Sequence, residues 1–258
     1  MNAKVAEITE TIAVRPIDLV DFQTKEKEVS INIDENTDVK ALKIYKKEYK
    51  IVKILNLVAK RVIDILGSMV GIILLVPLTV IVFVLNFINK DNGPLFYSHT
   101  RIGKDGKLFK MYKFRTMVVD ADKKLAKILE EDEEKRKEWE KNRKLKNDPR
   151  ITLIGNFLRK TSLDEFPQFL NVLKGEMSLV GPRAVVEDEI EMFGMYKKDV
   201  LSVKPGITGY WAANGRSDTT YEERVHMEYK YVEKFSVLMD IEILFKTVVS
   251  VIKKEGAV

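Results

Sequence analysis

The pattern of hydrophobic and polar positions is dominated by one long apolar run, from Ile65 to Ile88. Its 24 residues include no charged side chain. As an α-helix the run measures about 36 Å, which exceeds a hydrocarbon core of roughly 30 Å. Because 64 residues precede it, the run does not have the position of a secretory signal peptide. The pattern predicts a membrane-inserted helix, in its simplest form a single spanning anchor.

Pro77 and the charges on both sides of the run favour a different insertion. Proline removes one helical hydrogen bond and crowds the preceding turn, and Pro77 lies in the middle of the run. Residues 41–61 and 90–115 are both rich in Lys and Arg, and such residues tend to remain on the cytoplasmic side. We therefore expect a re-entrant membrane helix over residues 62–90, with a kinked spanning helix as the alternative.

The residues before the run divide into two parts. Residues 1–40 are polar, with five Lys or Arg against nine Asp or Glu, and we interpret them as an N-terminal extension. In residues 41–61, apolar side chains at helical spacing lie beside lysines, which is typical of an amphipathic helix on a membrane surface. This basic segment is predicted to lead into the membrane helix.

Residues 91–258 are predicted to form a cytoplasmic domain that begins with a β-hairpin. Asp105-Gly106 is a turn signal between two runs rich in β-branched and aromatic residues. Residues 120–148 contain ten Lys or Arg and ten Asp or Glu, and we expect one solvent-exposed helix with ion pairs four residues apart. The expected pairs are Glu131/Lys135, Asp132/Arg136, Glu133/Lys137 and Glu140/Lys144.

Two short helices are predicted next, from Thr152 to Lys160 and from Ser162 to Lys174, with Gly175 as the stop. Ser162 and Glu165 have the spacing of a capping box. The segment 204–218 contains Pro-Gly, Thr-Gly and Asn-Gly steps, which allow close approach of the backbone to a ligand. The chain ends in an amphipathic helical pattern. The predicted class is α+β, mostly helical and membrane-monotopic, with a small hairpin and amphipathic interfacial helices.

Composition narrows the chemistry. The net charge is +5 for the chain and −4 for residues 1–40, so the remainder carries +9, which suggests anionic partners. The chain has no cysteine and two histidines, which excludes a thiolate nucleophile and a multi-histidine metal site. Catalysis would then rest on carboxylates, Lys or Arg and a hard cation, and phosphate chemistry is favoured. Neither a P-loop nor a DNA-reading helix pair is recognisable, so nucleic acid is not expected as a partner.

Asp164 and Glu165 have two interpretations at this stage. Carboxylates in the first turn of a helix interact favourably with the positive end of its dipole. Alternatively, the pair supplies a nucleophile and a metal ligand, with the Gly-Pro-Arg at 181–183 as an anion clamp. The segment alone favours the structural interpretation, and the rest of the chain has to decide.

Five strings, in order, resemble a known family, the monotopic phosphoglycosyl transferases or bacterial sugar transferases. The resemblance extends from about Lys60 to Ala257. The strings are KRVIDI before the Pro-broken apolar segment, RIGKDGKLFKMYKFRTM, NDPRITLIGNFLRKTSLDEFPQFLNVLKGEMSLVGPR, KPGITGYWAANGRSD and DIEILFKTVVSVI. One such string is weak evidence, whereas five in order are specific.

The resemblance implies a re-entrant helix and a catalytic domain partly sunk in the inner leaflet of the bacterial cytoplasmic membrane, with the active site on the cytoplasmic face. Members of this family transfer hexose-1-phosphate from a UDP-hexose to undecaprenyl phosphate and release UMP. This step starts exopolysaccharide, capsule or O-antigen assembly. The family uses Mg²⁺ and a covalent sugar-phosphoryl aspartate, and a homodimer is compatible with the resemblance.

The roles carried over fall on matching positions. Asp164 corresponds to the nucleophile and Glu165 to its Mg²⁺-associated partner, so both are expected near the metal. Three cations match phosphate-binding positions, namely Lys113, Arg159 and Arg183. The nucleotide-sugar loop is represented by Gly206, Thr208, Gly209, Trp211, Asn214 and Arg216. The membrane positions are Lys60 and Arg61 at head-group level and Pro77 in the helix.

Three positions depart from the family pattern. Val76 replaces a serine before the membrane proline, and Thr79 or Ser68 would have to supply the missing hydroxyl. Ala184 replaces a proline, and Ala212 replaces a glutamine in the loop. Two alternatives stay open: a membrane-anchored interaction protein using the charged helix at 120–148, and a nucleotide-sugar glycosyltransferase without a covalent intermediate.

Overall fold

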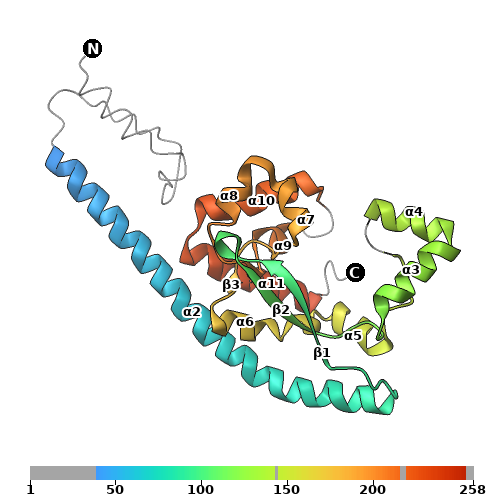
Figure 1. The fold of residues 1–258 in the computed structure, drawn as a ribbon. Helices are drawn as coiled ribbons and strands as arrows, with labels where there is room; N and C mark the ends of the chain where they lie inside the picture. The colour runs from blue at the N-terminus through green and yellow to red at the C-terminus, as the bar shows by residue number, and fades with distance from the viewer. Residues whose placement is uncertain (1–38, 143–144, 216–218, 254–258) are drawn as a thin grey trace.

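The computed structural model describes residues 39–142, 145–215 and 219–253. Within these residues the chain is mostly helical, with two small two-stranded sheets packed beside one long helix (Figure 1). The predicted α+β class, mostly helical with a hairpin, is confirmed. Nearly all of the predicted extension, residues 1–38, lies outside the described residues.

Helix α2 extends from Val39 to Ile88 and includes both the basic lead-in and the apolar run. Its portion from Ile51 to Ile88 is long and apolar enough to cross a membrane. The helix bends but continues through Pro77 (Figure 1), so a break into two half-helices is not confirmed. A proline within a helix is the usual physical cause of such a bend.

The expected hydroxyl replacement beside Pro77 is wrong. Because Pro77 has no N–H, the carbonyl of Ile73 loses its helical partner. Thr79 Oγ1 donates instead to the carbonyl of Leu75 at 2.7 Å, and Ser68 Oγ donates to that of Ile65 at 2.9 Å. Each hydroxyl has one proton, so neither supplies a donor to Ile73.

Helix α2 is fastened to the rest of the molecule by a buried carboxylate and two glycines. Asp64 accepts hydrogen bonds from Ser178 Oγ and from the backbone N–H of Leu179, both at 2.8 Å. A Cβ on Gly67 would lie 2.5 Å from the Leu179 side chain, and one on Gly71 would lie 2.3 Å from the Phe169 ring. The close packing therefore requires glycine at both positions, because any larger side chain would collide with the neighbouring residue.

The predicted hairpin is confirmed. Strand β1, Phe96–Ile102, pairs antiparallel with β2, Leu108–Phe114. The connection is a single 3-10 turn, η2, Lys104–Gly106, in which Asp105 and Gly106 have φ of 56° and 78°. Asp and Gly are the residues that tolerate this left-handed region, which explains the turn signal in the sequence.

The charged region folds as two helices, so the prediction of one helix is wrong. Helix α3 is Ala121–Glu131 and helix α4 is Glu133–Asn142. The chain breaks at Asp132, whose carboxylate accepts the backbone N–H of Lys135 at 3.0 Å and pairs with the Lys135 ammonium at 3.1 Å. Asp132 thereby caps the second helix. This Asp132–Lys135 pair replaces the predicted pairs Glu131/Lys135 and Asp132/Arg136, whereas Glu133 and Lys137 do pair at 2.9 Å. Lys144 of the fourth predicted pair lies outside the described residues.

Around the Asp-Glu pair, one predicted helix is confirmed and the other starts later than expected. Helix α5, Leu153–Lys160, is capped by Thr152. Ser162 has φ of 56° and makes no side-chain cap, so the predicted capping box is wrong. A 3-10 turn, η3, Leu163–Glu165, follows, and α6 occupies Gln168–Lys174 with Gly175 as its stop.

The remaining elements enclose the core. Strand β3, Ser178–Val180, pairs parallel with β4, Gly206–Thr208. Short elements α7 (Glu187–Ile190), η4 (Glu191–Tyr196) and α8 (Lys197–Val200) connect β3 to β4, and α9 (Tyr210–Asn214) connects β4 to two longer helices. These are α10, Tyr221–Lys234, and the predicted amphipathic C-terminal helix α11, Val237–Lys253. Side chains from β2, α6, β3, α10 and α11 meet in one hydrophobic cluster.

Candidate functional site

The Asp-Glu pair lies in η3, immediately after α5 and beside strand β2. A 3-10 turn places adjacent side chains about 120° apart, so the two carboxylates have different surroundings. Asp164 is buried, with 9% of its surface exposed. The side chain of Glu165 is 29% exposed and reaches the pocket described below.

Lys113 of β2 joins the two carboxylates. Its ammonium lies 2.6 Å from Glu165 Oε1 and 3.9 Å from Asp164 Oδ2. A strand presents alternate residues to the same face. The pairing Tyr97↔Lys113 places this lysine near the open end of the hairpin, away from the turn. The structure thus brings together three residues that the sequence predicted for the site.

The pKa values of the two carboxyls are driven in opposite directions. Burial raises the pKa of Asp164 to about 6, with Glu165 adding to the rise and Lys113 and Arg159 opposing it. Burial also raises the pKa of Glu165. The positive charge and hydrogen bond of Lys113, together with Arg183 and Gln168, outweigh this effect, so the pKa of Glu165 is lowered. Glu165 is therefore held as an anion, whereas Asp164 ionises near neutral pH.

Arg159 approaches the pair from the last turn of α5. Its Nε donates to Thr116 Oγ1 at 2.9 Å, which fixes the guanidinium. Burial lowers the pKa of Arg159, and the negative charge of Asp164 acts against that shift. Arg159 and Lys113 thus both attract the ionised form of Asp164, from different elements.

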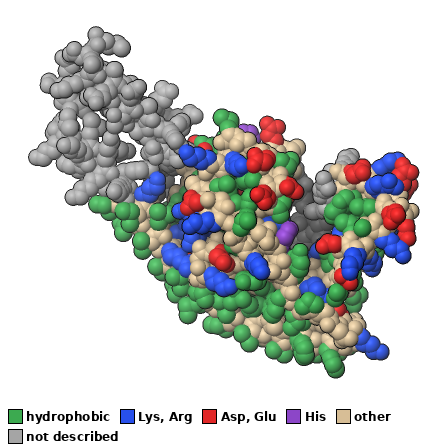
Figure 2. Space-filling model, in the orientation of Figure 1, with side chains coloured by type: hydrophobic (Ala, Val, Ile, Leu, Met, Phe, Trp, Pro, Cys, Tyr) green, Lys and Arg blue, Asp and Glu red, His purple; other side chains and the backbone are tan. Residues whose placement is uncertain are grey.

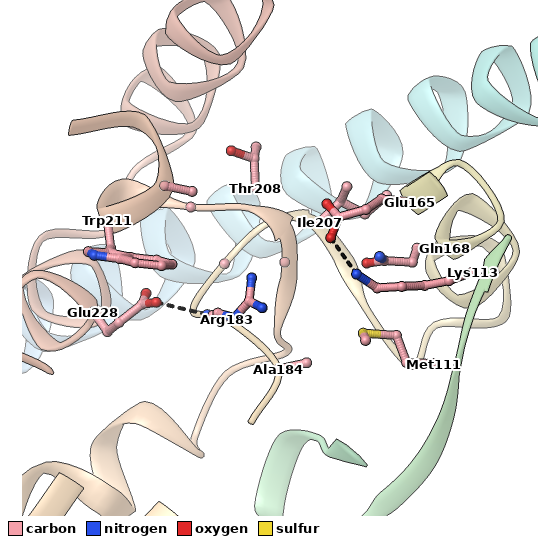
Figure 3. A pocket seen from close by; sticks show the side chains of 14 residues that line it. Met111, Lys113, Glu165, Gln168, Arg183, Ala184, Ile207, Thr208, Trp211 and Glu228 are labelled. Carbon is pink, nitrogen blue, oxygen red and sulfur yellow. Dashed lines mark hydrogen bonds and ion pairs between the residues drawn. The ribbon is translucent and has the colours of Figure 1, made fainter. Parts of the chain in front are cut away.

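An open pocket lies between this pair and the β3–β4 sheet. Figure 3 shows Lys113, Glu165 and Gln168 at one end and Arg183, Trp211 and Glu228 at the other. Arg183 follows β3, and its guanidinium lies 5.9 Å from the centre of the Trp211 ring. The full lining is Met111, Lys113, Glu165, Gln168, Gly181, Arg183, Ala184, Gly206, Ile207, Thr208, Gly209, Trp211, Ala212 and Glu228.

Of the residues predicted for the nucleotide-sugar loop, some line the pocket and others do not. Gly206, Thr208, Gly209 and Trp211 line the pocket. Asn214 instead points its side chain to the carbonyl of Tyr210 at 2.8 Å and to the Lys246 ammonium at 3.0 Å. Arg216 lies outside the described residues. Asp164 and Arg159 are beside the pocket rather than in its lining.

Sequence reasoning did not identify Gln168, Glu228 or Arg224. Gln168 lies in the first turn of α6, and Glu228 and Arg224 lie on α10, far along the chain. Glu228 has 1% of its surface exposed, which is unusual for a carboxylate. Its position in an ordinary charged helical pattern gives no signal of burial, and only the folded chain reveals it.

Lys60 and Arg61 of α2 make hydrogen bonds and an ion pair with the rest of the domain. The Lys60 ammonium lies 2.6 Å from Asp240 Oδ2 and also donates to the carbonyl of Val180 at 2.8 Å. Arg61 donates to the carbonyls of Val172 and Leu173 at 2.8 and 2.9 Å, at the end of α6. Both cations thus join α2 to the domain, and their head-group role stays a prediction.

The carboxylates could hold a magnesium ion only with help from other ligands. Among the described residues, His, Cys, Asp and Glu form no cluster of three or more. Asp164 and Glu165 nevertheless fit Mg²⁺, because this cation is usually bound by one or two carboxylates together with substrate phosphates and water. Cations of the chain, Lys113 and Arg183, border the same space.

Exposed apolar side chains gather along one edge of the molecule. Figure 2 shows a hydrophobic band along the lower edge, over α2, with Lys and Arg side chains directly above it. On α2 the exposed residues include Leu66, Ile73, Val80 and Phe87. Such a patch, bordered by charge, is typical of a membrane interface. The pocket therefore opens in a domain that is anchored beside an apolar surface.

An apolar anchor helix and a pocket in which Lys113 and Arg183 lie next to a carboxylate pair define a membrane-associated protein suited to anionic substrates. Residues 55–254 match the family model described as bacterial sugar transferase. The chain belongs to this family, and the resemblance stated from the sequence is confirmed.

Curated relatives extend the comparison. The chain is 44% identical over 229 residues, or 86% of its length, to undecaprenyl-phosphate galactose phosphotransferase of Salmonella typhimurium, covering 47% of that protein. It is 45% identical over 221 residues, 83% of its length, to UDP-galactose-lipid carrier transferase of Erwinia amylovora, covering 46%. The chain thus spans about half the length of these relatives. Against exopolysaccharide production protein ExoY of Sinorhizobium fredii, identity is 43% over 78% of the chain and 88% of the relative.

Proposed function

We propose that the protein transfers hexose-1-phosphate from a UDP-hexose to undecaprenyl phosphate and releases UMP, as the first step of a bacterial polysaccharide pathway. The observation that carries this proposal is the carboxylate pair joined by Lys113 at the edge of a pocket that Arg183 also lines. Family membership and the names of the galactose-transferring relatives support it. The relative from Escherichia coli is named for transfer of glucose-1-phosphate, so galactose and glucose are the hexoses to test.

The reaction proceeds in two displacements at one phosphorus atom. An oxygen of ionised Asp164 attacks the phosphorus that carries the hexose, and the bond from this phosphorus to the bridging oxygen breaks. UMP leaves with that oxygen, and a mixed anhydride of aspartate and sugar phosphate remains. A phosphate oxygen of undecaprenyl phosphate then attacks the same phosphorus, and the carboxylate of Asp164 leaves. Covalent catalysis of this kind divides one difficult step into two easier ones.

The chain's cations make the first attack feasible. A carboxylate approaching a diphosphate is repelled unless the charge of the phosphoryl oxygens is neutralised. Lys113 and Arg183 line the pocket where those oxygens would lie, and Arg159 lies beside Asp164. Gln168 and Lys113 hold Glu165 in place through hydrogen bonds. Bound through Glu165 and Asp164, Mg²⁺ would supply further neutralisation of the diphosphate.

The proposed location is the inner leaflet of the bacterial cytoplasmic membrane, with the pocket on the cytoplasmic face. The apolar α2 and the exposed hydrophobic band support membrane association. The reactive phosphate of undecaprenyl phosphate lies in the head-group plane, so a pocket beside the anchor has access to it. We propose that α2 is re-entrant, because basic residues flank the apolar run on both sides.

The direct test is UMP release from a panel of UDP-sugars in the presence of undecaprenyl phosphate. We expect release with UDP-galactose or UDP-glucose and its loss in Asp164→Asn with the fold intact. Release of UDP instead of UMP, from a labelled donor, would identify a glycosyltransferase. Unchanged function of Asp164→Asn would favour an interaction protein.

The covalent step has a separate test. Wild-type protein incubated with a radiolabelled UDP-hexose, without the lipid acceptor, should retain label after denaturation. Asp164→Asn should retain none, and Glu222→Gln, an exposed carboxylate on α10, should behave as wild type. Equal retention by all three proteins would refute the aspartyl intermediate.

A further inference from the structure

Glu228 is a buried carboxyl group whose two oxygens have different surroundings. Oε1 accepts the backbone N–H of Arg183 at 3.0 Å. Oε2 is buried and has no hydrogen-bond partner among the described residues. A buried polar atom without a partner costs free energy, and in native proteins such atoms are few. The free oxygen therefore requires an explanation.

The obvious internal partner is not used. Arg224 precedes Glu228 by four residues on α10, a spacing at which opposite charges pair. Its guanidinium instead lies over the rings of Trp211 and Tyr221, at 4.8 and 5.2 Å from their centres. Two of its buried nitrogens, Nε and Nη2, also lack a hydrogen-bond partner in the described part of the chain. The acceptor Oε2 of Glu228 and the donors of Arg224 thus lie on one helix without forming a hydrogen bond to each other.

The side chain that carries the free oxygen, Glu228, lines the end of the pocket opposite Lys113. Glu228, Arg183 and Trp211 all line that end, and Figure 3 shows the Glu228 carboxylate beside Trp211 and Arg183. The Trp211 ring is fixed, because its Nε1 donates to Thr219 Oγ1 at 2.8 Å. Gly209 also lies near the free oxygen, since a Cβ added to it would lie 3.8 Å from Oε2. An acceptor, an aromatic ring and a glycine backbone meet at one place.

We propose that Glu228 is a specificity-determining residue, whose free oxygen accepts a hydrogen bond from a neutral N–H or O–H group of the nucleotide-sugar. This inference rests on the proposed function and adds a recognition point to the same pocket. Three kinds of group in a UDP-hexose have this chemistry: the imide N–H of uracil, the two hydroxyls of ribose and the hydroxyls of the hexose. Any of these would satisfy Oε2 while Arg183 meets the adjoining phosphate charge. A site built around a buried acceptor rejects ligands that lack the donor.

The variant Glu228→Gln inverts the hydrogen-bonding character of the free position. Because the backbone N–H of Arg183 needs an acceptor, the amide oxygen of Gln takes the place of Oε1. The NH₂ group then occupies the place of Oε2, where it faces the donor of the ligand. The bond to Arg183 is kept, so the fold should survive. Glu222→Gln, on the exposed face of the same helix, is the matched control.

Binding is measured by calorimetry on the full chain in nanodiscs, at pH 8 and on the Asp164→Asn background so that no turnover occurs. The ligands are UDP, UDP-hexose, N3-methyl-UDP-hexose, the 2′- and 3′-deoxyribose analogues of UDP-hexose and the monodeoxy-hexose analogues. A hydrogen bond to a charged group corresponds to roughly a 10- to 100-fold change in Kd. We expect Glu228→Gln to weaken UDP-hexose binding by that factor and Glu222→Gln to leave it unchanged.

The ligand series identifies the donor. A loss of affinity that also appears with UDP assigns the imide N–H if it disappears with the N3-methyl analogue, and a ribose hydroxyl if it disappears with a deoxyribose analogue. A loss confined to UDP-hexose that disappears with one deoxy analogue assigns a hydroxyl. An equal loss for every ligand, no loss for any, or no binding by the parent chain overturns the inference.

Two further measurements keep the outcomes separate. If Glu228→Gln does not fold, the parent chain alone decides, because it must bind the matching donor-less analogue 10- to 100-fold more weakly than UDP-hexose. Equal affinity for all analogues would refute the recognition. UMP release by the wild-type chain tests the proposed function independently, so that function can hold while the role of Glu228 fails.

Discussion

At the scale of single residues, Asp164 combines two properties that oppose each other. Burial raises its pKa to about 6, which makes its carboxylate less solvated and a better nucleophile once ionised. Lys113, at 3.9 Å, and Arg159 limit this rise. The site therefore keeps Asp164 mostly ionised at pH 7, although burial of this charge destabilises the folded chain.

The acidic limb of the pH–rate profile should reflect this balance. Since attack requires the ionised carboxylate, kcat/KM is expected to fall about tenfold per pH unit below pH 6. Lys113→Met removes an attractive charge, so the pKa of Asp164 rises and the limb should move to higher pH. UMP release measured from pH 5 to 8 tests both expectations. An acidic limb at the same pH in both proteins would show that another group controls it.

The same shift has a consequence for stability. Between the unfolded pKa of 3.8 and the folded value of about 6, the folded chain binds more protons, so the free energy of unfolding falls as pH rises. At pH 8 the charged Asp164 is therefore destabilising, by about 3 kcal/mol. Asp164→Asn should raise the thermal midpoint at pH 8 and change it little at pH 3.5. A lower midpoint at pH 8 would contradict this sign.

At the scale of elements, the close contact between α2 and α6 depends on Gly71. A Cβ at this position would lie 2.3 Å from the Phe169 ring, and overpacking of this kind costs about 1–3 kcal/mol. Gly71→Ala should lower the thermal midpoint in detergent. Adding Phe169→Ala should produce a smaller loss than the sum of the two single changes. Additive effects would show that the two residues do not meet.

Periodicity predicted the elements that have strong local patterns, and tertiary contacts decided the rest. The apolar run, the Asp105-Gly106 turn and the helix predicted from Thr152 each carry their signal in a few neighbouring residues. The capping box at Ser162 failed because Ser162 adopts a left-handed conformation and the chain makes a 3-10 turn before α6. Sequence motifs likewise found Lys113 and the Asp-Glu pair. The role of Glu228 depends on burial against a strand far away in sequence, which no local pattern encodes.

At the scale of the whole molecule, the attachment of α2 constrains how the protein meets the membrane. Lys60 pairs with Asp240 of α11, and Asp64 binds β3, so the first part of α2 is held against the domain. The part beyond it carries exposed residues such as Phe87 and Ile88. A spanning helix would place the β-hairpin, which follows α2, across the membrane from Lys60. Because β2 also packs in the cluster with α10 and α11, the two ends of the apolar run are tied to one domain.

This connectivity predicts that both ends of the run lie on one side of the membrane. The chain has no cysteine, so Lys53→Cys and Asn92→Cys each introduce one thiol, and both positions are exposed. In spheroplasts, a membrane-impermeant maleimide should label neither, and both should react after permeabilisation. Asp122→Cys in α3, an exposed residue of the domain, is the control for cytoplasmic location. Labelling of Lys53→Cys alone before permeabilisation would show that α2 spans the membrane. In that case the domain could not hold both Lys60 and the hairpin, so the contact between Lys60 and Asp240 would have to open in the bilayer.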